Sequence, residues 1–184
     1  MRWIIHPEVR SEISALEFCK EFIGAFDTSS LDWIRIDLGR GTYAGAYGRC
    51  WYPVRSPRKG YRISVQVPGP FPYSHRRYVK PLYQNSDGSW PPIPFEATAA
   101  GYCQATRNGV TRRWQRLTVE YRMETRAIAL VHIFAHEAFH YLRRSQQIPG
   151  RNRENEADLF AVSIEATFRE RMGADANSTE VPAI

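Results

Sequence analysis

The residues with the clearest chemical potential lie within one short run, His136-Glu137-Ala138-Phe139-His140. Four residues of α-helix advance about 400°, so the imidazoles of His136 and His140 project from one face of the helix, one turn apart. Both can therefore bind a single ion. Zinc held there would lower the pKa of a bound water to about 7, and Glu137 could take the proton from that water. The pattern therefore predicts zinc-dependent amide hydrolysis, with a peptide or protein as the substrate.

A catalytic zinc needs three protein ligands and one exchangeable position, so the two histidines require a further ligand. Fourteen residues after His140 comes the run Glu154-Asn155-Glu156-Ala157-Asp158, at the start of another predicted helix. Glu154 and Asp158 are one turn apart on that helix, so Glu154 could bind the ion while Asp158 accepts a hydrogen bond from a ligand histidine. Glu156 points about 200° away from Glu154 and is the alternative third ligand.

A structural explanation of the histidine motif competes with the chemical one. About one unrelated chain in a few hundred would carry the motif by chance, and its polar groups could simply be satisfied within a core. The motif falls, however, in a helix predicted to be buried. Such a helix rarely contains two histidines and a glutamate without a partner for each of them. We therefore expect a metal ion at this site.

Residues 136–140 and 154–161 together resemble the active-site helices of the gluzincin metallopeptidases. The resemblance covers roughly residues 125 to 165, and it implies a compact zincin-like fold in which an edge strand binds the substrate as an added strand. It assigns no residue to stabilise an oxyanion. The roles that it implies are zinc ligands His136, His140 and Glu154, catalytic base Glu137, and Asp158 as the residue that orients a ligand histidine.

Hydrophobic periodicity predicts the elements that position these residues. Apolar residues at three- and four-residue steps predict helices, alternation of apolar and polar residues predicts strands, and the Asn108-Gly109 dipeptide predicts a tight hairpin. Seven prolines between Pro68 and Pro94 predict an irregular lid or binding loop. The predicted elements are a helix over 7–26, strands over 33–38 and 61–67, a hairpin of 97–106 and 113–121, and helices over 123–145 and 152–172, the last with Asn152 as its N-cap.

This order of elements predicts an α+β fold, and the resemblance implies a zincin-like minimal metallopeptidase domain. We expect the hairpin and the preceding strands to form one small twisted sheet packed on the helix of residues 123–145. The helix of residues 152–172 would lie beneath, with zinc between the two helices. One domain would then cover residues 1–172, and the small, polar residues 173–184 would form a flexible tail.

Composition predicts the class of protein and its compartment. The chain has 184 residues, 43% of them apolar, which is enough to bury one core without disulfides or a stabilising metal. It has no run of eighteen apolar residues and no signal-peptide core, so we expect a cytoplasmic protein with no membrane partner. Cys19, Cys50 and Cys103 form no Cys-x-x-Cys pair. Buried free thiols are expected, and a disulfide between Cys50 and Cys103 stays open.

The formal charge of +6 is unevenly distributed along the chain. Residues 53–86 contain seven basic side chains, several tyrosines and no acidic side chain, a composition that favours an anionic partner. Two functions compete with the metallopeptidase: a non-catalytic zinc-binding regulatory or interaction module, and a nucleic-acid-associated protein that uses the 53–86 region. The sequence does not indicate the oligomeric state.

Four residues close to the histidine motif have ordinary structural interpretations. His132 lies one turn before His136, and we expect it to be a core histidine that bonds a backbone carbonyl. We expect Tyr141 to be a packing residue. Arg143 and Arg144 fall at the predicted end of the helix, where their positive charge would complement the helix dipole.

Overall fold

The computed structural model of the chain describes residues 1–39, 45–53, 60–94 and 97–178, without the side chains of 75–80 and 174–178. The chain divides into two compact units. Unit 1 contains Met1–Pro72 and Met123–Ile184, and unit 2 is the insertion Tyr73–Arg122. Helices and sheets are both present, as the predicted α+β class requires. The expectation of one domain over 1–172 did not anticipate that an internal segment forms a unit of its own.

Unit 1 is built on a four-stranded sheet with the strand order β1-β2-β4-β3. Strands β1, β2 and β4 are parallel to one another, and β3 runs antiparallel to β4. Two of the strands, β2 and β4, confirm the strands predicted from alternation. The strands are β1 (Arg2–Ile5), β2 (Leu31–Leu38), β3 (Tyr47–Trp51) and β4 (Tyr61–Val67).

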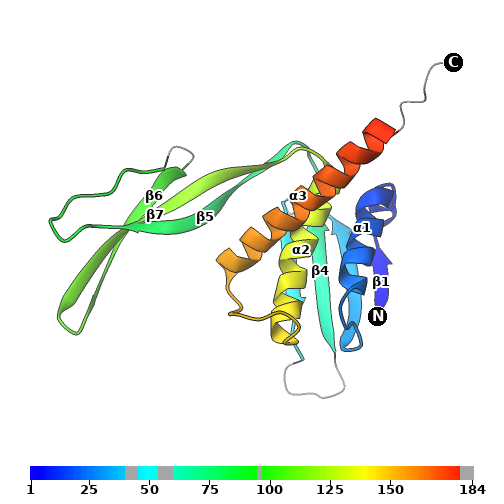
Figure 1. Ribbon diagram of the computed structural model, residues 1–184, viewed down its shortest axis with the longest axis horizontal. Coiled ribbons are helices and arrows are strands. Elements are labelled where there is room, and N and C mark those ends of the chain that lie inside the picture. The colour runs from blue at the N-terminus through cyan, green and yellow to red at the C-terminus, as the bar shows by residue number, and fades with distance from the viewer. Residues whose placement is uncertain (40–44, 54–59, 95–96, 179–184) are drawn as a thin grey trace. The chain divides into compact units, whose positions relative to one another are not determined.

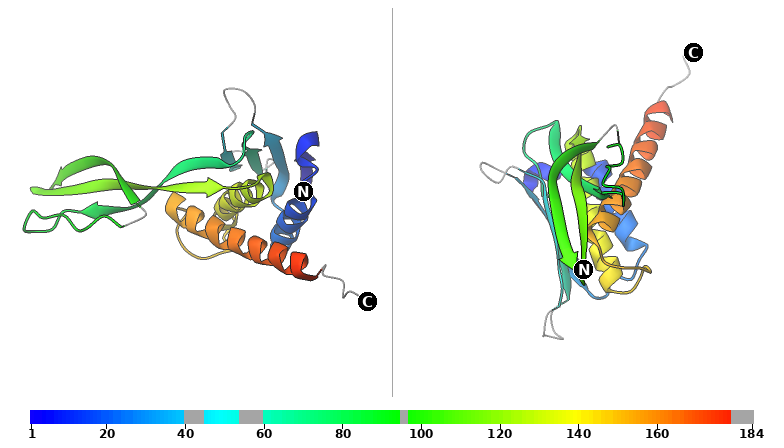
Figure 2. Two further views of the ribbon diagram at one scale, coloured as in Figure 1. Left: turned by 90° about the horizontal axis from the view of Figure 1, so that it is seen from above. Right: turned by 90° about the vertical axis from the view of Figure 1, so that its left-hand side faces the viewer.

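The helices of unit 1 lie on one face of this sheet. Figures 1 and 2 show α1 and α2 against the sheet, with α3 crossing α2 on the side away from the strands. The helix predicted over 7–26 begins later than expected, because a short 3-10 turn precedes it. The elements are η1 (Pro7–Val9), α1 (Ile13–Gly24), α2 (Arg126–Arg144) and α3 (Glu154–Ser178).

The helix that carries the histidine motif, α2, forms the centre of the core. Thr125 caps its start, since the Thr125 hydroxyl accepts a hydrogen bond from the Ile128 N–H at 3.3 Å. Phe134 packs against Trp3 and Phe22, with ring centroids 5.8 and 6.3 Å apart. Nearly all side chains between Ile128 and Leu142 are buried. The prediction of a helix threaded through the core is confirmed.

Unit 2 is a three-stranded sheet with the order β5-β7-β6. Asn108 and Gly109 join β6 to β7 with φ values of 51° and 74°, so the predicted hairpin turn is confirmed. The prediction of an irregular segment over 68–94 is wrong where β5 forms. That strand lies at the edge of its sheet, where a proline such as Pro81 is compatible with a strand. The strands are β5 (Tyr73–Tyr83), β6 (Ala97–Arg107) and β7 (Val110–Met123).

Three further predictions can be compared with this fold. The single twisted sheet is wrong, because the hairpin belongs to unit 2 and the other predicted strands belong to unit 1. All three cysteine thiols are free, so Cys50 and Cys103 form no disulfide. Helix α3 continues to Ser178, beyond the predicted start of the tail, and residues 179–184 lie outside the described part of the chain. Within the described residues, no helix is both long enough and apolar enough to cross a membrane.

The burial of α2 predicts how the stability of unit 1 responds to mutation. Leu130 on α2 is fully buried, whereas Leu159 on α3 is 64% exposed. Leu130→Ala should lower the free energy of unfolding by about 2–5 kcal/mol, because it removes buried methyl groups and leaves a cavity. The matched Leu159→Ala should change it by less than about 0.5 kcal/mol. Urea denaturation in EDTA measures both, and equal losses would contradict the described packing.

Candidate metal centre

Three side chains from two helices converge at one point. His136 and His140 come from α2 and Glu154 from the first turn of α3, and one ligand atom from each lies within 4.8 Å of the others. The Nε2 atoms of the two histidines are 3.2 Å apart. Glu154 Oε2 lies 3.2 Å from His136 Nε2 and 3.5 Å from His140 Nε2. The structure thus brings the three predicted ligands into a group that could hold a metal ion.

The other nitrogen of each imidazole is held by a hydrogen-bond acceptor. His136 Nδ1 lies 3.0 Å from Asp158 Oδ1, as the sequence predicts for Asp158. His140 Nδ1 lies 2.7 Å from the side-chain oxygen of Asn152. Each acceptor favours a proton on Nδ1 and so leaves the Nε2 lone pair directed at the shared point.

The role of Asn152 differs from the one that the sequence predicts. Asn152 was expected to cap the second helix, but its side-chain oxygen is bonded to His140. The Arg153 carbonyl accepts the first helical bond, from the Ala157 N–H at 3.0 Å. No feature of the local sequence distinguishes a capping asparagine from one that turns back toward α2. Its position two residues before Glu154 is the only signal that could have suggested the second role.

The three convergent atoms require a positive charge between them. When both Nδ1 atoms carry protons, the two Nε2 atoms and the Glu154 carboxylate all act as acceptors, and their lone pairs repel one another unless a proton or a cation intervenes. Burial lowers the pKa of His136, but the hydrogen bond to Asp158 and the nearby Glu137 and Glu154 carboxylates outweigh it, and the net effect raises that pKa. An environment that favours a proton on His136 also favours a metal cation.

Glu137 is buried beside this group but is not a member of it. Burial raises the pKa of the Glu137 carboxyl to about 7, the neighbouring His136 opposes this rise, and Glu154 adds to it. The backbone N–H of Cys50 on β3 donates a hydrogen bond to the same carboxylate. Glu137 thus lies next to the ligands, and its role as a base stays a prediction.

Gly48 on β3 makes room for the Glu137 side chain. A methyl group at position 48 would overlap the carboxylate of Glu137, so any larger residue would have to displace it. Sequence reasoning missed this contact. The glycine-punctuated, aromatic segment before Trp51 was the available signal, but a glycine by itself does not reveal which side chain it accommodates.

Glu156, His132 and Tyr141 lie outside the group of three convergent side chains. Glu156 bonds Arg143 at 3.2 Å and lies outside the group of three, so the alternative third ligand is not supported by the geometry. His132 is buried as expected, and its Nδ1 lies 2.9 Å from the buried Glu165 carboxylate of α3, a partner that the sequence does not predict. The packing role of Tyr141 is confirmed. It is fully buried, and its hydroxyl donates to the Asp27 carbonyl at 2.6 Å.

The group is closed toward the core and open toward solvent. The side chain of His140 is only 7% exposed and that of His136 is 19% exposed, whereas that of Glu154 is 82% exposed. A ligand or a substrate can therefore approach from the side of Glu154. The two imidazoles are held in place by the core on the other side.

Comparisons with protein-family models, with curated proteins and with solved structures find no match for this chain. The geometry of its own residues therefore carries the assignment of a function.

The separation of Glu154 from Glu156 predicts which carboxylate matters for metal binding. Purified protein loaded with zinc and then desalted should retain about one ion per chain, as a single three-ligand site requires. Glu154→Ala should lose most of this zinc because it removes a ligand. The matched Glu156→Ala should retain it, since Glu156 bonds Arg143 instead. Elemental analysis measures the retained zinc, and a loss confined to Glu156→Ala would contradict the described group.

Proposed function

We propose that this chain is a zinc-dependent metallopeptidase with a zincin-like, gluzincin-type site in unit 1. The observation that carries the proposal is the convergence of His136, His140 and Glu154 beside the buried carboxylate of Glu137. The hydrogen bonds that orient both imidazoles support the same function. Catalytic metal sites commonly fix their histidines in this way.

The spacing of the three ligand atoms supports zinc as the ion. Tetrahedral zinc with nitrogen and oxygen ligands at about 2.0–2.2 Å places those ligand atoms about 3.3–3.6 Å apart. The three separations in the group are 3.2, 3.2 and 3.5 Å. Two imidazoles and a carboxylate are also a typical catalytic set that keeps a fourth position open, whereas magnesium and calcium prefer oxygen ligands alone.

The residues around the group are suited to the hydrolysis of an amide. Zinc at this site would polarise the substrate carbonyl and lower the pKa of a water at the open position. Glu137 accepts the proton of the attacking water on its carboxylate and returns it to the nitrogen of the leaving amine. Burial raises the pKa of the Glu137 carboxyl above its ordinary value, which makes its carboxylate a stronger base.

The position of β3 supports a peptide as the substrate. β3 is the last strand in the sheet order, so one of its edges is not used by β4. Gly48 and Cys50 of this strand contact Glu137, through the space at Gly48 and the backbone N–H of Cys50. An extended peptide added to the strand edge would align its backbone by main-chain hydrogen bonds and present a carbonyl near Glu137.

Replacement of the base separates catalysis from metal binding. Glu137→Gln should retain zinc but lower the cleavage rate by about 10²–10⁴-fold, because the amide cannot accept the proton. The matched Glu170→Gln changes an exposed carboxylate of α3 and should cleave like the unmodified protein. Cleavage of a mixed peptide library by the zinc-loaded proteins, followed by mass spectrometry, measures both rates.

Two results would contradict the proposal. Undiminished cleavage by Glu137→Gln would exclude the proposed mechanism. Zinc retention without cleavage of any library peptide by the unmodified protein would favour a non-catalytic zinc-binding module.

A further inference from the structure

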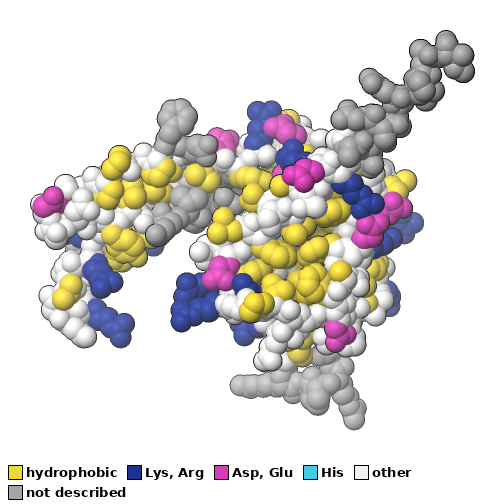
Figure 3. Space-filling view, viewed as in Figure 1, with side chains coloured by type: hydrophobic (Ala, Val, Ile, Leu, Met, Phe, Trp, Pro, Cys, Tyr) yellow, Lys and Arg dark blue, Asp and Glu magenta, His cyan; other side chains and the backbone are white. Residues whose placement is uncertain are grey.

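Unit 2 carries most of the net positive charge of the chain. Residues 73–122 contain eight basic and three acidic side chains, a net of +5 out of the total of +6. The same segment contains eight aromatic side chains. Lys and Arg side chains gather toward the end of the β6–β7 hairpin (Figure 3). The electrostatic potential of this unit therefore favours a polyanion.

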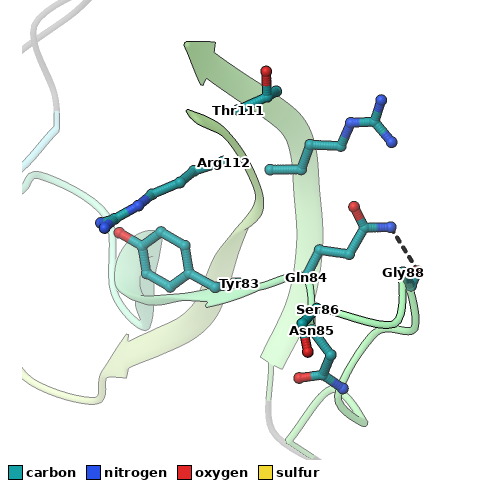
Figure 4. A pocket seen from close by; sticks show the side chains of 8 residues that line it. Tyr83, Gln84, Asn85, Ser86, Gly88, Thr111 and Arg112 are labelled. Carbon is teal, nitrogen blue, oxygen red and sulfur yellow. Dashed lines mark hydrogen bonds between the residues drawn. The ribbon is translucent and has the colours of Figure 1, made fainter. Parts of the chain in front are cut away.

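A pocket of about 570 Å³ lies within unit 2. Figure 4 shows the side chains of Tyr83 and Arg112 next to one another on one side of this pocket. On the other side, Gln84 donates a hydrogen bond to the Gly88 carbonyl at 2.6 Å and so closes the loop that follows β5. The pocket is lined by Tyr83, Gln84, Asn85, Ser86, Gly88, Thr111, Arg112 and Arg113.

The two arginines of the pocket are available to an anion. Arg112 and Arg113 are both exposed, and neither has an ion-pair partner among the described residues. Asp87 is the acidic residue of the adjoining loop, and its Oδ1 accepts bonds from the Ser89 N–H and hydroxyl at 2.8 and 2.6 Å. The guanidinium groups can therefore bind phosphate oxygens in the bidentate manner that arginine favours.

The aromatic side chains of unit 2 are unusually exposed for residues of their size. Tyr83 is 51% exposed and packs one side of its ring near Trp114, with centroids 6.3 Å apart. Tyr102 is 73% exposed and meets Trp90 at 5.7 Å. In each pair the tryptophan packs near the tyrosine ring, which remains exposed to solvent. Such rings are stacking platforms for unpaired bases.

We propose that unit 2 binds single-stranded nucleic acid at this pocket, with phosphates on Arg112 and Arg113 and a base stacked on Tyr83. The amide and hydroxyl groups that line the pocket can bond the edges of that base. A duplex offers no unpaired base to Tyr83, and an acidic peptide offers no succession of planar rings. The site is independent of the metal centre, so either proposal can fail without the other.

This site overlaps only in part with the region that the sequence predicts for an anionic partner, because residues 83–86 line the pocket but its two arginines lie outside that region. That prediction placed the partner on the basic region 53–86. Residues 54–59 and the side chains of 75–80 lie outside the described part of the chain, so much of that region is not described. The pocket is lined by the end of β5, the loop that follows it and the start of β7.

Fluorescence anisotropy with a labelled oligothymidylate of about 16 nucleotides tests the proposal on the full chain. The oligonucleotide should bind, and its affinity should fall steeply with salt. Arg112→Ala/Arg113→Ala should weaken binding at least about 10-fold and reduce the salt slope by about 1.4, since each lost phosphate contact contributes about 0.7. Tyr83→Ala should weaken binding about 5- to 100-fold, whereas Tyr83→Phe, which keeps the ring, should bind like the unmodified protein.

A matched control removes the same charge from unit 1. Arg2→Ala/Arg10→Ala lowers the net charge by two at exposed positions of that unit and should leave binding unchanged within about 2-fold. Equal weakening by the two double variants would overturn the proposal, as would an unchanged affinity of Arg112→Ala/Arg113→Ala. Competition by polyglutamate or by duplex DNA as effective as that by the unlabelled oligonucleotide would also overturn it. The folding of each variant is checked by circular dichroism.

Discussion

The structure of unit 1 depends on one constraint: a helix in the centre of the core carries several polar side chains that are buried or mostly buried. Leaving one such group without a partner costs about 1–3 kcal/mol, and more when it is charged. Three histidines and one glutamate of α2 each have a partner outside that helix. The pairs are His132 with Glu165, His136 with Asp158, His140 with Asn152, and Glu137 with the backbone N–H of Cys50.

These pairs explain why α3 and β3 lie where they do. Small residues at positions 157 and 161 are fully buried, which allows α3 to approach α2 closely enough for the contacts of Asp158 and Glu165. Gly48 allows the same close approach of β3. The positions that satisfy the core also bring Glu154 to the two imidazoles. The same packing of α2, α3 and β3 therefore gives the polar side chains of α2 their hydrogen-bond partners and assembles the candidate metal site.

The sequence predicts those parts of the site that follow from helix periodicity. One-turn spacing relates His136 to His140 and Glu154 to Asp158, and all four lie where the spacing requires. The parts that depend on contacts between distant segments could not be predicted. Gly48 meets Glu137 across the fold, and the separation of the hairpin into unit 2 depends on strand pairing that alternation alone does not specify. Pro81 was misleading because proline is compatible with an edge strand.

X-ray absorption at the zinc edge, on protein that carries about one zinc per chain, tests the proposed metal centre most directly. The account predicts two imidazole nitrogens at about 2.0–2.1 Å and carboxylate or water oxygens at about 2.0–2.2 Å, with no sulfur ligand. A sulfur shell at about 2.3 Å would place the ion on a cysteine and contradict the account. A spectrum without imidazole scattering would contradict it equally.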